Sequence, residues 1–494
     1  MATVPQSRPD NRPSAGLPEL RRTFDLVRAA FRLCAPGYAK RIATLKTLQA
    51  AVLDHRDEII NATNEDFGGR ARHETLILEL APLVDAIRHT RKHLASWMKP
   101  QGVTAGINFF PGRARIIYQP LGVVGILSAW NYPTLLTLLP LVDAIAAGNH
   151  VMLKPSELAP RTAEVLQKLI ARSFPAEYIS VVRGDAQLAA EFSALPFDHL
   201  LFTGSARVGK LVMKSASENL TPVTLELGGK CPAIVHRDFP LRTAVERIIT
   251  GKLYNAGQTC LAPDYVFVHE SQCDEFVKLA GEVTRQLYPT LSGNADYTRI
   301  INSQHLERLN DLVRDAVGRG ARPVALGTQA NSEILFSQSN RPSTIAATDR
   351  LMPPAVLLDV NDGMQIMQGE IFGPILPVLT YRELTDALRY VNDHAHPLAL
   401  YYFDDDAHRV DHVLNTTTSG GVTVNDVIFH IAQNNLPFGG IGSSGMGHYH
   451  GRAGFETFSK KKGIFLQSRW SSLKFLRPPY GLLADKIIRF LLRR

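Results

Sequence analysis

Strand-like and helix-like segments alternate between residues 120 and 217, and this alternation constrains the fold more than any other feature of the chain. The short apolar runs "HVMLKP", "YISVVRG" and "HLLFTGS" read as strands, and the amphipathic runs "TAEVLQKLIARSF", "AQLAAEFSAL" and "ARVGKLVMKSAS" read as helices. Strands and helices in this order predict a doubly wound parallel sheet, and therefore an α/β fold. Such sheets bind ligands at the carboxyl ends of their strands.

Two other regions flank this one. Residues 21–100 carry apolar positions with helical spacing, as in "ELRRTFDLVRAAFRL" and "KRIATLKTLQAAVLDHRDEIINAT". A second alternating region follows residue 226, with the strand-like runs "CPAIVH", "YVFVHES" and "ILPVLTY". Residues 330–350 are polar and rich in serine and threonine, which predicts a surface loop. At 494 residues, the chain is long enough for two or three domains.

Charge and cysteine content narrow the classes of function. The net charge is +8, but the basic residues are scattered except at the two ends, so we expect no nucleic-acid partner. The cysteines are far apart and form no CxxC pair, which argues against a disulfide framework and against a metal site. They indicate a reducing compartment, and we expect a cytoplasmic protein. The four are Cys34, Cys231, Cys260 and Cys273.

The two ends of the chain differ from its body. Residues 1–20 lack an apolar core and predict a disordered tail rather than a secretory signal; a transit peptide is a weaker alternative, because Asp10 and Glu19 interrupt it. No apolar run is long enough for a transmembrane helix. Residues 476–494 form a basic amphipathic tail, in which "LLADKIIRFLLRR" gathers apolar side chains near one helical face. This tail could dock on the protein itself, or make weak contact with an anionic membrane surface.

Two candidate anion and ribose contacts follow strands of the first region. In "HLLFTGSARVGKLV" a strand leads through Gly204 and Ser205 into a helix that contains Gly209, and a helix N-terminus attracts phosphate. In "HVMLKPSELAP" Lys154 ends a strand and Glu157 follows three residues later, so both side chains could reach ribose hydroxyls. Taken alone, the first motif also fits an ordinary strand–turn–helix, and the second fits a solvated ion pair.

Three further residues have the chemistry of an acyl-transfer site. Asn131 lies in a turn before Pro133, where an amide can donate to an oxyanion. Glu226 lies in the apolar run "TPVTLELGG", where a carboxylate has a raised pKa that suits a general base. Cys260 lies in the Gly/Gln/Thr turn of "YNAGQTC", with space for a ligand beside Gly257. A turn-forming asparagine, a structural ion pair and a buried structural cysteine remain the alternatives for each residue in isolation.

In combination, these motifs resemble the aldehyde dehydrogenase superfamily. The matching stretches are "WNYP", "LKPSE", "FTGSARVG", "TLELGGK", "NAGQTC", "EIFGP" and "LPFGGIGSSGMG", in the order of the family, and the resemblance covers roughly residues 25–475. The stretches "IINSQHLERL", "PLALYYF", "GHYHGRAGFETFSKKKG" and "RPPYG" look like the branch of coniferyl, fatty and aryl aldehyde dehydrogenases.

The resemblance implies roles for individual residues. Cys260 aligns with the nucleophile, Glu226 with the base that activates water, and Asn131 with the oxyanion donor. Phe438 is implied on the substrate side of the site. Residues implied to bind the cofactor are Trp130, Lys154, Glu157, Gly204, Ser205, Gly209, Leu227, Gly228, Glu370 and Phe372.

The resemblance also implies an architecture and an activity. A Rossmann-type NAD-binding domain would span residues 21–226, with an oligomerisation hairpin near 105–122. A catalytic domain would span 227–424, and residues 425–475 would return to the cofactor domain and to a small oligomerisation element of a homodimer. The expected reaction is oxidation of an aromatic or a medium-to-long aliphatic aldehyde to the acid through a cysteine thioester, with NAD preferred and NADP an alternative. A non-catalytic cofactor-binding or structural protein on the same fold is the competing function.

Overall fold

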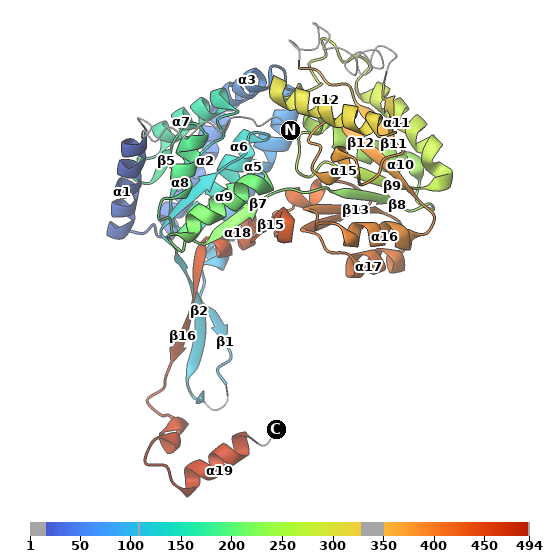
Figure 1. Cartoon of the computed structure of the whole chain (residues 1–494). Helices are drawn as coiled ribbons and strands as arrows, with labels where there is room; N and C mark the ends of the chain where they lie inside the picture. The colour runs from blue at the N-terminus through green and yellow to red at the C-terminus, as the bar shows by residue number, and fades with distance from the viewer. Residues whose placement is uncertain (1–15, 107–108, 328–349, 493–494) are drawn as a thin grey trace, which may run out of the picture.

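The computed structural model describes residues 16–106, 109–327 and 350–492. The tail predicted for residues 1–20 and the loop predicted for 330–350 therefore lie outside the described residues, apart from 16–20 and 350. Two sheets stand side by side with helices around them, and a narrow arm extends from the first one (Figure 1).

The first sheet is the predicted parallel sheet. Its strand order is β15-β7-β6-β3-β4-β5, and all neighbours are parallel except β15 with β7. The strands are β3 (Val123–Leu127), β4 (His150–Lys154), β5 (Ile179–Val181), β6 (His199–Thr203), β7 (Val223–Glu226) and β15 (Gly445–Met446). The chain order reverses at β3, which lies between β4 and β6, so the carboxyl ends of these strands surround a crevice suited to a ligand.

Helices cover both faces of this sheet, because the side chains of each strand alternate between two cores. In β3, Val124 and Ile126 belong to one hydrophobic cluster, and Val123 and Leu127 belong to the other. Helices α2, α5, α6 and α7 pack on the first face, and α1, α8 and α9 on the second. Helix α6 is buried along its whole length. The helices are α1 (Leu17–Leu33), α2 (Tyr38–Asp54), α3 (Arg56–Phe67), α4 (Arg72–Thr75), the π-helix η1 (Leu76–Leu80), α5 (Ala81–Trp97), α6 (Pro133–Ala147), α7 (Pro160–Ser173), α8 (Ala186–Ser193) and α9 (Ala206–Ser217).

The second sheet is built from residues 232–424, as the second alternating region predicted. Its strand order is β10-β11-β12-β9-β8-β13-β14, and only β10 runs antiparallel to its neighbour. The strands are β8 (Pro232–Val235), β9 (Tyr265–His269), β10 (Arg322–Ala325), β11 (Ala355–Leu358), β12 (Ile375–Tyr381), β13 (Ala399–Phe403) and β14 (Gly421–Val424). Its helices are α10 (Leu241–Leu253), α11 (Cys273–Leu287), α12 (Ser303–Gly318), α15 (Gln365–Gln368), α16 (Leu384–Asp393) and α17 (Ala407–Thr416).

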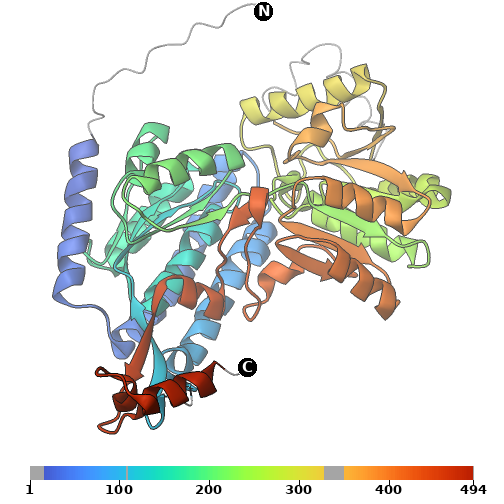
Figure 2. The ribbon, with the colours of Figure 1, turned by 60° about the horizontal axis from the view of Figure 1, so that its bottom comes forward.

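The arm is a three-stranded antiparallel sheet made from distant parts of the sequence. Its central strand β2 (Arg113–Pro120) pairs with β1 (Gln101–Val103) and with β16 (Ser459–Leu466). The hairpin expected near residues 105–122 is thus formed by β1 and β2 and begins at Gln101. Helix α18 (Gly451–Thr457) leads into β16, and η7 (Ser472–Leu476) and α19 (Leu482–Leu491) follow at the far end of the arm (Figures 1 and 2).

The remaining short helices lie in connecting segments. They are η3 (Tyr254–Gly257), η4 (Glu270–Gln272), η5 (Phe429–Ala432) and η6 (Gly442–Ser444). Within the described ranges, no helix is both long enough and apolar enough to cross a bilayer.

Candidate active site

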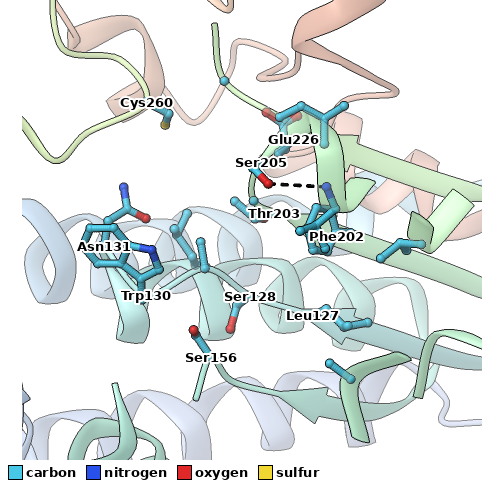
Figure 3. A pocket seen from close by; sticks show the side chains of 18 of the residues that line it. Leu127, Ser128, Trp130, Asn131, Ser156, Phe202, Thr203, Ser205, Glu226 and Cys260 are labelled. Atoms are coloured by element: carbon cyan, nitrogen blue, oxygen red, sulfur yellow. Dashed lines mark hydrogen bonds between the residues drawn. The ribbon is translucent and has the colours of Figure 1, made fainter. Parts of the chain in front are cut away.

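A cavity of about 670 Å³ opens at the carboxyl ends of β3, β4, β6 and β7, and α12 and the loops around the second sheet contribute further lining residues. It brings together nearly all of the residues singled out in the sequence, and Figure 3 shows Trp130, Asn131, Ser205, Glu226 and Cys260 among them. The predicted residues that line it are Trp130, Asn131, Lys154, Glu157, Gly204, Ser205, Glu226, Leu227, Gly228, Cys260, Glu370, Phe372 and Phe438. Gly209 is the exception.

Cys260 reaches the cavity through an unusual backbone turn. Helix α10 ends at Leu253, and Asn255, Ala256 and Gly257 then adopt φ angles of 53°, 50° and 75°. A side chain at Gly257 would place its Cβ 2.2 Å from the carbonyl oxygen of Gly373, so only glycine is accommodated there. The Cys260 side chain is partly exposed. Burial, with smaller effects from the Glu370 and Glu226 charges, raises its pKa, so the thiol is the resting form.

Asn131 lies in the turn between β3 and α6 and is 2% exposed. Its Nδ2 donates to the carbonyl of Gln258 at 3.1 Å, which orients the amide. Figure 3 shows the amide nitrogen on the side that faces Cys260. Because the amide carries two hydrogens, it can make this bond and still donate to an oxyanion beside the sulfur.

Glu226 is the last residue of β7 and is 4% exposed. Neither carboxylate oxygen has a conventional hydrogen-bond partner among the described residues. Burial raises the pKa of Glu226 well above its usual value, with a small opposing effect from the Gly440 backbone N–H. A carboxylate in this state can accept a proton from water near neutral pH.

The floor of the cavity is suited to a phosphate and a ribose. Ser205 is the N-cap of α9, where its Oγ accepts a bond from the Val208 N–H at 3.4 Å. Its hydroxyl hydrogen and the N–H groups of the first turn remain suited to an anion. Lys154 is buried at the end of β4, and its Nζ lies 3.0 Å from Glu157 Oε2.

Gly209 does not line the cavity. It lies inside α9, where an added Cβ would come within 2.4 Å of Leu227 Cδ2. Its lack of a side chain lets α9 pack closely against Leu227, which does line the cavity.

Glu370 also lines the cavity and presents an unsatisfied oxygen. Its Oε1 is buried and has no hydrogen-bond partner in the part of the chain that the structure describes. Burial raises the pKa of Glu370 to about 8. At Gly228, which has a φ of 77°, a Cβ would come within 2.3 Å of this oxygen. A ribose hydroxyl would satisfy it, and together with the helix N-terminus these features fit a nicotinamide dinucleotide.

His305, Arg308 and Tyr449 also line the cavity; they lie in stretches that indicated the branch, but the sequence predicted no role for them. His305 on α12 lies 5.1 Å from Trp130 between ring centroids, and Arg308 Nη2 donates to the Ile371 carbonyl at 2.5 Å, which holds the loop that carries Glu370. Tyr449 lines the cavity beside Phe438. The motif "GHYHGRAGF" contained Tyr449, but only as a mark of the branch.

Comparisons with known proteins agree with this geometry. The family model described as "Aldehyde dehydrogenase family" matches residues 14–464. A Pseudomonas aeruginosa protein named "Probable coniferyl aldehyde dehydrogenase" is 47% identical over 92% of this chain and 92% of its own length. The structure titled "Substrate bound state of Staphylococcus Aureus AldH" is 37% identical, with a TM-score of 0.88 over 96% of this chain and 99% of that one.

A structure of Mycobacterium tuberculosis aldehyde dehydrogenase complexed with NAD+ is 26% identical, with a TM-score of 0.81 over 93% of this chain and 92% of that one. The family model spans most of the sequence, and the relatives match over nearly their whole lengths. The chain belongs to the aldehyde dehydrogenase family, whose members oxidise aldehydes with NAD(P)+.

Proposed function

We propose that this enzyme converts an aldehyde to the carboxylic acid with Cys260 as nucleophile, Asn131 as oxyanion donor and Glu226 as general base. The supporting observation is that three segments far apart in the sequence place these side chains in one cavity. In this proposal residues 21–226 bind the cofactor, residues 227–424 carry the nucleophile, and residues 425–475 return to the cofactor domain and to the oligomerisation element.

In this mechanism the Cys260 thiol gives up its proton to water in the cavity, and Sγ then forms a bond to the carbonyl carbon while the π pair of the C=O bond moves to the oxygen. The Asn131 amide and the Cys260 backbone N–H donate to the developing oxyanion. NAD(P)+, when bound, supplies the two-electron oxidant that turns this adduct into a thioester. Glu226 then takes a proton from water, the resulting hydroxide attacks the thioester carbon, and the C–S bond breaks to release the acid and the Cys260 sulfur.

The first test is Cys260→Ala. This variant should bind NAD with the affinity of the native enzyme, because Cys260 is not needed to hold the dinucleotide, and should produce no NADH when an aldehyde is added. Absorbance at 340 nm and NAD fluorescence titration measure the two properties. Retained turnover would refute the nucleophile assignment.

For the cofactor, we propose NAD rather than NADP. Glu157 is held beside the ribose end of the cavity by Lys154, and its carboxylate would repel a 2′-phosphate. Glu157→Gln should therefore lower the ratio of kcat/KM measured with NAD to kcat/KM measured with NADP. An unchanged ratio would count against this role of Glu157.

For the substrate, we propose an aromatic aldehyde of the coniferyl type. The support is the name of the P. aeruginosa relative and the aromatic rings of Phe438 and Tyr449 on the Cys260 side of the cavity. Comparison of kcat/KM for coniferyl aldehyde, benzaldehyde, hexanal and a long-chain aldehyde tests this. A preference for the aliphatic members would replace the aromatic proposal with the aliphatic one.

We further propose that the enzyme is a homodimer in the cytoplasm. A three-stranded sheet without a core of its own needs a covering surface, and most of β16 is exposed. A second copy is the partner that the family resemblance implies. The cytoplasmic location rests on four cysteines that form no disulfide.

We also propose that the C-terminal tail makes weak contact with an anionic membrane surface. Leu482, Leu483 and Phe490 of α19 are 78%, 53% and 78% exposed. Trp470 and Tyr480 beside this helix are exposed as well, as is common for side chains at a membrane interface. The basic residues that outnumber the single acidic Asp485 in the sequence of this tail are Arg477, Lys486, Arg489, Arg493 and Arg494.

A further inference from the structure

A buried cluster of charges lies behind the active site, in the segment that forms α4 and η1. Arg70, Glu74 and Glu79 are 3%, 8% and 0% exposed. None of them lines the cavity. Burying three ionisable side chains is costly unless each is held by partners, so the bonds they make indicate what the cluster does.

Glu74 holds the turn that carries Cys260. Its Oε1 accepts the backbone N–H of Asn255 at 3.1 Å, and its Oε2 accepts the hydroxyl of Thr298 at 2.7 Å. Asn255 is the first of the three consecutive residues with positive φ that precede the nucleophile. Non-glycine residues avoid this conformation, so it persists only where neighbouring groups fix it.

Arg70 contacts the loop that carries Asn131, and through Tyr132 it is linked to the loop that carries Cys260. Its Nη1 donates to the carbonyl of Asn131 at 2.7 Å. Its guanidinium also lies 4.8 Å from the ring centroid of Tyr132. The Tyr132 hydroxyl is hydrogen-bonded to Thr259 Oγ1 at 2.7 Å, and Thr259 directly precedes Cys260.

Glu79 completes the cluster at the start of α6. Its Oε2 accepts the N–H groups of Thr134 at 2.9 Å and of Leu135 at 3.1 Å. These groups lack partners within the helix, so the carboxylate both satisfies them and fixes the turn that carries Asn131. Arg70 Nη2 lies 3.4 Å from Glu79 Oε1, which balances the charge.

The two loops are also bonded directly to each other. Asn255 Nδ2 donates to the carbonyls of Asn131 at 3.0 Å and Gln258 at 3.1 Å. Asn131 Nδ2 donates to the same Gln258 carbonyl. The cluster therefore supports one rigid unit that contains both the sulfur and the oxyanion donor.

We propose that Glu74 and Arg70 are positioning residues that set the Cys260 sulfur against the Asn131 amide from outside the cavity. The inference rests on the proposed roles of Cys260 and Asn131. Neither residue touches the substrate or the dinucleotide. Their contribution is to hold the geometry needed at the transition state, and it should appear in kcat rather than in cofactor binding.

The test compares Glu74→Ala with Glu74→Gln. Alanine removes both bonds, whereas glutamine keeps an oxygen for the Asn255 N–H and an amide for the Thr298 hydroxyl. We expect Glu74→Ala to lower kcat on the order of 100-fold, and Glu74→Gln to restore most of that loss. NAD affinity should stay within about twofold in both, because the residues that would hold the dinucleotide are untouched.

Two further variants keep the test decisive. Tyr132→Phe removes only the bond to Thr259 and keeps the packed ring, so it should fold and still lower kcat, even if Glu74→Ala fails to fold. Glu65→Ala, which removes an exposed carboxylate of the neighbouring α3, is the matched control and should leave kcat unchanged.

Native kcat in both Glu74→Ala and Tyr132→Phe would overturn the inference, as would a Glu74→Gln variant as impaired as Glu74→Ala. Turnover by Cys260→Ala would instead refute the proposed function, so the two failures are distinguishable.

Discussion

Among single residues, Glu226 and Cys260 show most directly how burial prepares a side chain for chemistry. Both lie where desolvation disfavours the charged form, and the pKa of each is raised. The proposed nucleophile is thus a thiol at rest, and it must lose its proton before Sγ attacks the aldehyde. This state protects the sulfur from reaction between turnovers.

Glu226→Gln should separate the two halves of the reaction. Glutamine cannot take a proton from water, so hydrolysis of the thioester should become slow while its formation proceeds. Stopped-flow absorbance at 340 nm should then show a burst of NADH followed by a steady-state rate on the order of 100-fold below the native one. An unchanged steady-state rate would contradict the assignment of Glu226 as base.

Glu370 predicts a pH dependence of cofactor affinity. Its pKa of about 8 means that the carboxyl is protonated below that pH and charged above it. Since a charged carboxylate is the stronger acceptor for a ribose hydroxyl, NAD should bind more tightly as the pH rises from 7 to 9. Isothermal titration across this range measures the effect, and Glu370→Gln should flatten it. A slope that survives in Glu370→Gln would assign the titration to another group.

Sequence reasoning at this scale identified the residues that lie in named motifs. Of the residues it implied for the cofactor, only Gly209 lies outside the cavity wall. It gave no role to His305 and Arg308, although both lie in the stretch "IINSQHLERL", and it missed the Arg70–Glu79 pair, because tertiary packing alone places these side chains in or behind the site. The residues that flank a buried arginine in the sequence do not differ from those that flank an exposed one, so burial cannot be predicted from them.

At the scale of helices and strands, the alternating pattern was sufficient to predict the first sheet. The strand-like runs "HVMLKP" and "HLLFTGS" became β4 and β6, and the helical run "ARVGKLVMKSAS" became α9. The pattern could not predict that β15 would join this sheet from residues 445–446, or that β16 would pair with β2. Such pairings depend on long-range contacts that local periodicity does not encode.

Helix α19 is the element whose exposed face carries a prediction. Because its apolar and basic side chains point outward together, the enzyme should co-sediment with vesicles of phosphatidylglycerol and less with vesicles of phosphatidylcholine. A variant with Lys486→Glu and Arg489→Glu should lose this binding and keep its turnover, since α19 lies at the far end of the arm (Figure 2). Equal sedimentation with both lipids, or with neither, would refute the contact.

For the whole molecule, the arm predicts the state of assembly. Light scattering coupled to size exclusion should give twice the mass of one chain, because the exposed sheet of β1, β2 and β16 needs a covering surface. Placing a charge on this sheet with Ile464→Asp should shift the enzyme toward a single chain. A single-chain mass for the native enzyme would refute the dimer.

The short connection between β7 and β8 joins the two parts of the chain that carry the proposed catalytic residues. Glu226 ends β7 of the first sheet, and Cys260 lies between η3 and β9, in the segment that leads into the second sheet. A polypeptide cut between Leu227 and Cys231 would leave the proposed proton acceptor, Glu226, on one fragment and the proposed nucleophile, Cys260, on the other. NADH production by such a split enzyme would therefore measure the association of its two fragments.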